Sequence, residues 1–252
     1  MKLKVISFNI RNCDDVNGHS VAERAPRLKA VIGKYSPDII CLQEYKAIWE
    51  PYITEYYGDE YELYIKFRDS SANSEATPIL WRKDKFECIK TGYFWLSDTP
   101  EVESRGWDEL YNCYRICLYA VLKDKASGKT FTVMNTHYGF GDKGQAASSR
   151  LIYEYAKKIS PYKTFVTGDF NMTPDSCGYA AMVENLTDLN AVTANDQGTT
   201  YHGYDPDNIT DEHIDYCFID ENIKPVNQSV MRETVEGKYP SDHFGLFIEL
   251  EI

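Results

Sequence analysis

The sequence lacks the features of several protein classes. Its seven cysteines are odd in number and form no Cys-x-x-Cys pair, so neither a disulfide framework nor a cysteine zinc site is expected. No apolar stretch approaches the roughly 18 residues that cross a bilayer. Met1 to Phe8 already form a strand-like run with no basic-then-apolar leader before it. We therefore expect a cytoplasmic protein with no membrane span.

Phosphate-binding loops and basic clusters are also missing. The sequence contains no GxxxxGK[ST] or GxGxxG pattern. Its 27 Lys and Arg against 39 Asp and Glu give a net charge of −12, and we find no cluster of Lys and Arg. Because an acidic molecule repels a polyanion, stable binding of long duplex nucleic acid is not expected. The composition favours a small or locally bound phosphate ester.

The composition is that of an ordinary globular α/β protein. The chain has 252 residues, 43% of them hydrophobic, and no repeat or linker divides it. We expect one domain over residues 1–252. Apolar residues at helical spacing predict helices over residues 21–35, 145–159 and 178–186, and the polar turn at 123–129 predicts a hairpin between strands at 116–122 and 131–135.

Six further apolar runs each carry a small polar cluster at one end, at residues 5–9, 39–44, 133–137, 165–171, 213–219 and 241–248. The polar residues follow the apolar ones in the first four runs and precede them in the last two. If all six clusters meet at one rim, the last two strands run opposite to the others and the sheets are mixed. With about ten or more strands and few helices, two stacked sheets with outer helices are the expected architecture.

The clusters contain the groups needed for metal-assisted hydrolysis of a phosphate ester. Glu44 and Asn9, at the ends of adjacent predicted strands, can supply the oxygen ligands that Mg²⁺ binds. Asp169 can orient a water, and Asn171 can donate a hydrogen bond to a phosphoryl oxygen. Taken separately, Glu44 and Asn9 are equally compatible with solvated strand ends, and Gly168-Asp169-Phe170-Asn171 with a simple turn.

A carboxylate-oriented imidazole is the second expected feature. Asp242 precedes His243, and Asp215 lies on what we predict to be the neighbouring antiparallel strand. Such a carboxylate fixes the tautomer and can hold the ring charged, for donation to the transition state or for acid-base catalysis. His137 is a second candidate of this kind.

Taken together, the ordered motifs resemble those of the endonuclease/exonuclease/phosphatase family: Ser-Phe-Asn9-Ile-Arg11, Leu-Gln-Glu44, Asn135-Thr-His137, Gly-Asp169-Phe-Asn171, Ile-Asp215-Tyr and Ser-Asp242-His243-Phe. The resemblance runs from Asn9 to His243. It implies a four-layered sandwich of two mixed β-sheets flanked by helices, as in deoxyribonuclease I, and a phosphoesterase that depends on Mg²⁺ or Mn²⁺.

The resemblance also implies roles for individual residues. Glu44 is expected to bind the metal with help from Asn9, and Asp242 to lie at the metal site. Asp169 and Asn171 are expected around the attacking water and the phosphate, and His243 paired with Asp215.

Three further assignments come from the same resemblance. Glu75, in Glu-Ala-Thr-Pro-Ile, resembles the carboxylate that partners His137 in the deoxyribonuclease branch. Arg115 resembles an arginine that contacts phosphate, and Arg11 is a second substrate-binding candidate.

The sequence departs from the family pattern in two places. Tyr138-Gly139-Phe140 replaces a more polar segment after His137, and Gly245 stands where Pro is common. These departures concern the substrate side, and fold membership does not fix a substrate. Three readings stay open: a phosphodiesterase or phosphomonoesterase for a small molecule, lipid head group or short oligonucleotide; a nuclease acting on DNA or RNA; and a non-catalytic phosphate-binding protein on the same scaffold.

Overall fold

The computed structural model describes residues 1–193, 198–205, 207 and 213–252. Its strands form two six-stranded mixed sheets. The first sheet has the order β11 (Lys224–Met231), β12 (Gly245–Glu251), β1 (Lys2–Asn9), β2 (Ile39–Gln43), β4 (Ile79–Arg82), β3 (Tyr61–Tyr64). The second has the order β5 (Phe86–Trp95), β6 (Ile116–Asp124), β7 (Thr130–His137), β8 (Lys163–Asp169), β10 (Asp215–Ile219), β9 (Thr187–Asp188).

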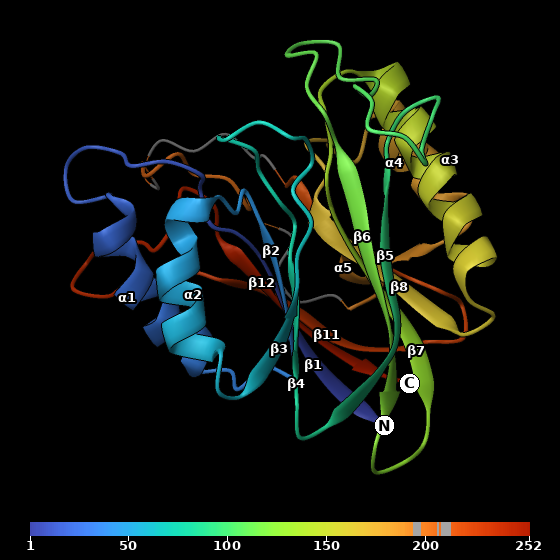
Figure 1. The fold of residues 1–252 in the computed structure, drawn as a ribbon, viewed down its shortest axis with the longest axis horizontal. Helices are drawn as coiled ribbons and strands as arrows, with labels where there is room; N and C mark the ends of the chain where they lie inside the picture. The colour runs from blue at the N-terminus through green and yellow to red at the C-terminus, as the bar shows by residue number, and fades with distance from the viewer. Residues whose placement is uncertain (194–197, 206, 208–212) are drawn as a thin grey trace.

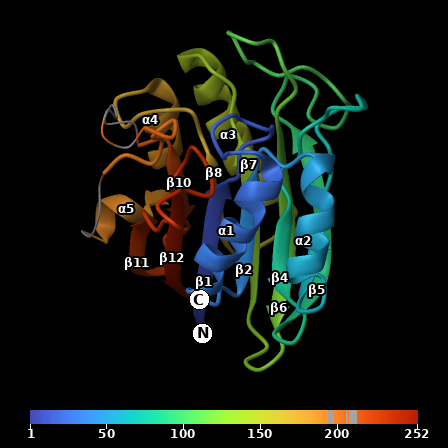
Figure 2. The same cartoon turned by 90° about the vertical axis from the view of Figure 1, so that its left-hand side faces the viewer.

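Helices cover the outer face of each sheet and complete four layers (Figures 1 and 2). The helical elements are α1 (Val21–Gly33), the 3₁₀ turn η1 (Ala47–Trp49), α2 (Glu50–Tyr57), α3 (Asp142–Ile159), α4 (Cys177–Val183) and α5 (Leu189–Val192). Three hydrophobic clusters separate the layers: one between α1–α2 and the first sheet, one between the sheets, and one between the second sheet and α3–α4. The expected four-layered sandwich is confirmed.

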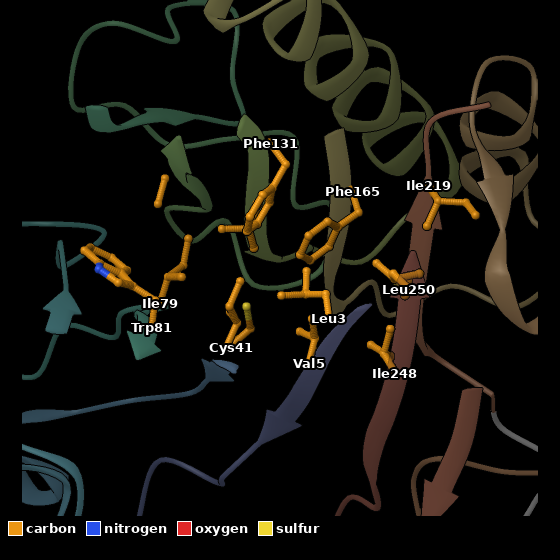
Figure 3. Packing of buried hydrophobic residues seen from close by; sticks show 14 of the residues in the cluster. Leu3, Val5, Cys41, Ile79, Trp81, Phe131, Phe165, Ile219, Ile248 and Leu250 are labelled. Carbon is orange, nitrogen blue, oxygen red and sulfur yellow. The ribbon is translucent and has the colours of Figure 1, made fainter. Parts of the chain in front are cut away.

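The central cluster follows from the alternation of side chains along each strand. Leu3 and Val5 of β1 point between the sheets, whereas Ile6 and Phe8 pack under the outer helices. Figure 3 shows the same inward face meeting Phe131 and Phe165 of the second sheet. Strands with this pattern are apolar on both faces because both faces are covered.

The inward face becomes polar at one end of the sandwich. The alternation that puts Leu3 and Val5 inside also puts Ser7 and Asn9 on that face. The inward-facing residues of four other strands likewise become polar at this end of the sandwich, namely Gln43 in β2, His137 in β7, Asp169 in β8 and Asp215 in β10. All four of these side chains are buried or nearly so. The functional groups therefore continue the inner core and do not lie on the outer surface.

Strand directions agree with the sequence analysis. β1 is parallel to β2 and antiparallel to β12, and β7 is parallel to β8, which is antiparallel to β10. One expectation was wrong: β10 and β12 are not neighbours, because β10 belongs to the second sheet and β12 to the first. Asp215 and His243 consequently meet across the sandwich, where the two sheets face each other.

The elements that the sequence analysis missed are mainly strands at sheet edges. β5 and β11 are edge strands with several exposed or half-buried residues, so they lack a regular apolar pattern. The helix expected over 145–159 begins at Asp142. No helix in the described part of the chain is long and apolar enough to cross a membrane.

Candidate active site

A cleft with a volume of about 530 Å³ opens where the inner faces become polar. Nine of the eleven residues that the sequence analysis selected line it: Arg11, Glu44, Glu75, Arg115, His137, Asp169, Asn171, Asp242 and His243. The other two, Asn9 and Asp215, lie behind it and hydrogen-bond to lining residues. Residues far apart in the sequence thus share one site.

Asn9 connects the carboxylates of the two sheets. Its Nδ2 donates to Glu44 Oε1 at 3.1 Å and to Asp169 Oδ2 at 2.8 Å, while its Oδ1 accepts from the Arg11 backbone N–H at 3.0 Å. The amide nitrogen, and not the oxygen, faces the carboxylates. Asn9 therefore positions Glu44 and Asp169, and its expected place among the metal ligands stays a prediction.

Glu44 and Asp242 form the acidic side of the cleft. Burial and the charge of Glu44 raise the pKa of Asp242, although the charge of His243 opposes this. Glu44 Oε2 accepts from the Asn12 backbone N–H at 2.9 Å, which fixes the carboxylate. Both carboxylates line the cleft and keep unused lone pairs, which suits a hard divalent cation such as Mg²⁺ or Mn²⁺.

A second group of possible ligands is Asp169, Asp215 and His243, whose ligand atoms all lie within 4.8 Å of one another. These three side chains already have hydrogen-bond partners: His243 Nδ1 is 2.9 Å from Asp215 Oδ2, and Asp169 Oδ2 accepts a hydrogen bond from Asn9 Nδ2. A bound cation there would have to displace these bonds. Glu44 and Asp242 are therefore the better-suited pair.

His243 is held charged by its surroundings. Burial alone would lower the pKa of this imidazole, but the charge and hydrogen bond of Asp215, with the charges of Asp169 and Asp242, outweigh that effect and raise it to about 10. The opposite ring atom, Nε2, lies 3.7 Å from Asp169 Oδ2. Burial and the charge of Asp215 raise the pKa of Asp169. The cleft thus holds a cationic donor beside a carboxylate with an elevated proton affinity.

Asn171 and His137 contact each other directly. Asn171 Nδ2 lies 3.0 Å from His137 Nε2 and donates to the Tyr138 carbonyl at 3.0 Å. Both amide hydrogens are thereby used, so the expected hydrogen bond from Asn171 to a phosphoryl oxygen is not available in this arrangement. Burial, followed by the charges of Arg115 and Arg68, holds the pKa of His137 well below its usual range. His137 is therefore neutral.

Glu75 occupies the cleft but not in its expected role. Its carboxylate accepts from Arg68 Nη1 at 2.8 Å and from Asn12 Nδ2 at 3.0 Å, whereas His137 is next to Asp169, with Nε2 3.5 Å from Oδ2. The expectation that Glu75 partners His137 is corrected. It balances the charge of Arg68 instead.

The two predicted substrate-binding arginines differ in their surroundings. Arg11 forms a two-point ion pair with Asp15, its Nε lies 3.6 Å from Asp242 Oδ2, and the hydrogen bond with Asp15 raises its pKa. Arg115 is buried, and its Nη2 lies 3.5 Å from Asp108 Oδ2. Both reach the cleft.

Gly168 is required by close packing and not by a turn. It lies inside β8 with φ of 154°, and a Cβ there would come within 2.1 Å of the Thr136 carbonyl oxygen of β7. The expected turn begins only after Asp169, where Asn171 has φ of 48° and donates its N–H to Asp169 Oδ1. Asp169 therefore ends β8, and Asn171 lies in the turn that follows it.

Several lining residues escaped the sequence analysis: Asn12, Arg68, Tyr111, Cys113 and Tyr201. Tyr111 is 64% exposed and packs edge-on against Phe140, with ring centroids 5.4 Å apart. These residues belong to loops, where neither periodicity nor a polar cluster at a strand end marks a residue. The 20 tyrosines of the chain do not by themselves show which of them lies near the site.

A family model for the endonuclease/exonuclease/phosphatase family matches residues 6–243, nearly the whole chain. The chain belongs to the endonuclease/exonuclease/phosphatase family. Members of this family are phosphoesterases. The match includes every residue of the cleft named above.

Solved structures agree with the family assignment. A family protein from Bacteroides thetaiotaomicron is 29% identical, with a TM-score of 0.91 and coverage of 99% of this chain and 97% of that one. A mannosyl-6-phosphatase from the same organism is 28% identical, with a TM-score of 0.88 and coverage of 99% and 100%. TDP2 of D. rerio in complex with a single-stranded DNA product, at 18% identity and a TM-score of 0.75 over 100% and 99%, shares the fold.

The departures from the family pattern have structural reasons. Tyr138 is fully buried in the cluster under α3 and α4, so only Phe140 of that segment reaches the cleft. A Cβ at Gly245 would come within 2.7 Å of the Phe8 ring, so this family member packs a glycine there against an aromatic side chain.

Proposed function

We propose that this protein hydrolyses small phosphate esters by in-line attack of water, with Mg²⁺ or Mn²⁺ held by Glu44 and Asp242. The observation that carries the proposal is the position of buried Asp169. Its Oδ2 lies within 4 Å of His137 and His243, and Asn9 links it to Glu44. These positions support the proposal that Asp169 acts as the base, His243 as the charged donor, and Glu44 with Asp242 as the cation site around one space.

The acidic side fits a divalent cation. Burial and the charge of Glu44 raise the pKa of Asp242, and a divalent cation bound by Asp242 would favour its charged form. Asn9 and the Asn12 N–H hold Glu44 from behind, which is the usual arrangement behind a metal ligand. When bound, the cation supplies charge stabilisation to the phosphoryl and leaving oxygens.

The other groups act on the water and the phosphate. Asp169 accepts a proton from the attacking water, and its raised pKa suits a base that works near neutral pH. His243, kept protonated by Asp215, donates Nε2–H to a phosphoryl oxygen as negative charge accumulates there. His137 and Asn171 border the same space and limit the approach of solvent.

The nuclease remains the second candidate. The fold shared with TDP2, which was solved with a DNA product, favours it, whereas the net charge of −12 disfavours a long duplex. A non-catalytic scaffold would be expected to have lost one of Glu44, Asp169, Asn171 or His243, and all four are present and in the cleft.

Chelation tests the proposal. Purified protein should release phosphate or alcohol from a panel of sugar phosphates, aryl phosphates and short oligonucleotides, because the cleft has the size of a small ligand site. EDTA should abolish the activity, and added Mg²⁺ or Mn²⁺ should restore it. Full activity in chelator would refute the role of the cation.

A further inference from the structure

Arg115 carries two hydrogen-bond donors that nothing in the described part of the chain satisfies. The residue is 6% exposed, and its Nη2 lies 3.5 Å from Asp108 Oδ2. Its Nε and Nη1 are buried without a partner among the described residues. A buried guanidinium with unsatisfied donors is costly, so this position is expected to have a ligand.

Arg68 presents a third such donor. Its Nη1 is bonded to Glu75 Oε2 at 2.8 Å, but its Nε is buried and has no hydrogen-bond partner among the described residues, since the nearest carboxylate oxygen, Asp69 Oδ2, is 3.9 Å away. Neither periodicity nor a strand-end position distinguishes this residue in the sequence. In the fold it lies beside Arg115.

Both arginines line a narrow recess that adjoins the cleft. The space has a volume of about 10 Å³ and is bounded by Arg68, Arg115, Glu44, Glu75 and His137, all of which also line the cleft. It is about large enough for one oxygen atom or water. Ala76, Thr77 and Ile116 close its remaining sides.

The charges of the two arginines act on this space. They help to lower the pKa of His137, after burial, and they oppose the rise in the pKa of Glu75 that burial causes. The cleft therefore has an acidic side at Glu44 and Asp242 and a basic side at Arg68 and Arg115. A phosphoryl group between the two sides would direct one oxygen toward the guanidinium groups.

We propose that the Arg68–Arg115 pair binds a terminal phosphate oxygen and makes this protein selective for phosphomonoesters. This rests on the proposed function. A monoester dianion has a third non-bridging oxygen to fill this narrow recess, and guanidinium donors bind phosphate oxygens strongly. In a diester that oxygen carries a carbon substituent, for which about 10 Å³ leaves no room.

Two esters with the same leaving group provide the first test: p-nitrophenyl phosphate and methyl p-nitrophenyl phosphate. The wild-type protein should prefer the monoester. Arg115→Met and Arg68→Met should each lower kcat/KM for the monoester by about 10- to 100-fold, the scale of a lost hydrogen bond to a charged group, and leave the diester within about 3-fold. Arg150→Met, on the exposed face of α3, is the matched control and should change neither.

Phosphate binding provides a second readout that needs no turnover. In calorimetry at pH 8 with chelator, inorganic phosphate should bind the wild type and Arg150→Met equally, and at least about 10-fold more weakly to either cleft variant. Dimethyl phosphate should bind all four proteins weakly. Thermal unfolding identifies a variant that fails to fold, in which case the other arginine variant decides.

The inference would be overturned by equal losses on both esters, by wild-type hydrolysis of the diester as fast as the monoester, or by unchanged phosphate binding in both variants. Failure of the proposed function has a different signature, which is no metal-dependent hydrolysis of either ester by the wild type. The phosphate titration still decides the inference in that event.

Discussion

At the scale of the residue, His243 and Asp215 are the most closely coupled pair of the cleft. The pair joins the two sheets through a 2.9 Å hydrogen bond, and both side chains are almost fully buried. Because the imidazole is charged at neutral pH, removing Asp215 would leave a buried cation without its principal partner. The two residues should therefore act as one unit.

The predicted consequence is non-additive loss of activity. His243→Ala should lower kcat by at least about 100-fold, the scale for a positioned acid-base or charge-stabilising group. Asp215→Asn added to His243→Ala should cost little more, since residues that act as a unit do not lose activity independently. Steady-state kinetics of both single variants and the double variant measure this. Losses that multiply would show that the two side chains work separately.

At the scale of the element, β7 is tied to the first sheet directly behind the cleft. Asn135 Nδ2 donates to the carbonyls of Leu42 at 2.8 Å, Thr77 at 3.1 Å and Pro78 at 3.0 Å, and its Oδ1 accepts from Gln43 Nε2 at 2.7 Å. Asn135 is fully buried, two residues before His137 on the same face of the strand. Its amide thus sets the spacing of the sheets where the two halves of the site meet.

Asn135→Ala should consequently destabilise the fold. The substitution removes the hydrogen bonds of Asn135 to three buried carbonyl groups and from the Gln43 amide, so the free energy of unfolding should fall by about 1–3 kcal/mol. Urea unfolding of the wild type and the variant measures the difference. Asn185→Ala, at an exposed asparagine, is the control and should stay within about 0.5 kcal/mol of the wild type. If the two substitutions lowered the free energy of unfolding equally, Asn135 would not hold the two sheets together as proposed.

At the scale of the whole molecule, the sequence predicted the layers and the location of the site because both follow from strand periodicity. Polar residues at the ends of apolar runs come together at one end of each sheet when the strands align, as Asn9 and Gln43 do in the first sheet and His137 and Asp169 in the second. The sequence could not predict that His243 meets Asp215 across the sheets, because pairing between sheets has no local signal.

The acidic charge of the molecule has a local counterpart in the cleft. Glu44 and Asp242 add to the net charge of −12, and a divalent cation would offset them where the phosphate approaches. The central claim is therefore that one cation site, built on Glu44, supports hydrolysis in this cleft.

Titration of Mn²⁺ followed by paramagnetic resonance, with hydrolysis of p-nitrophenyl phosphate measured on the same samples, tests that claim most directly. Glu44→Gln should weaken Mn²⁺ binding and metal-dependent hydrolysis together, each by at least about 10-fold. Glu55→Gln, exposed on the outer helix α2, should leave both unchanged. Undiminished Mn²⁺ binding and hydrolysis in Glu44→Gln would contradict the account.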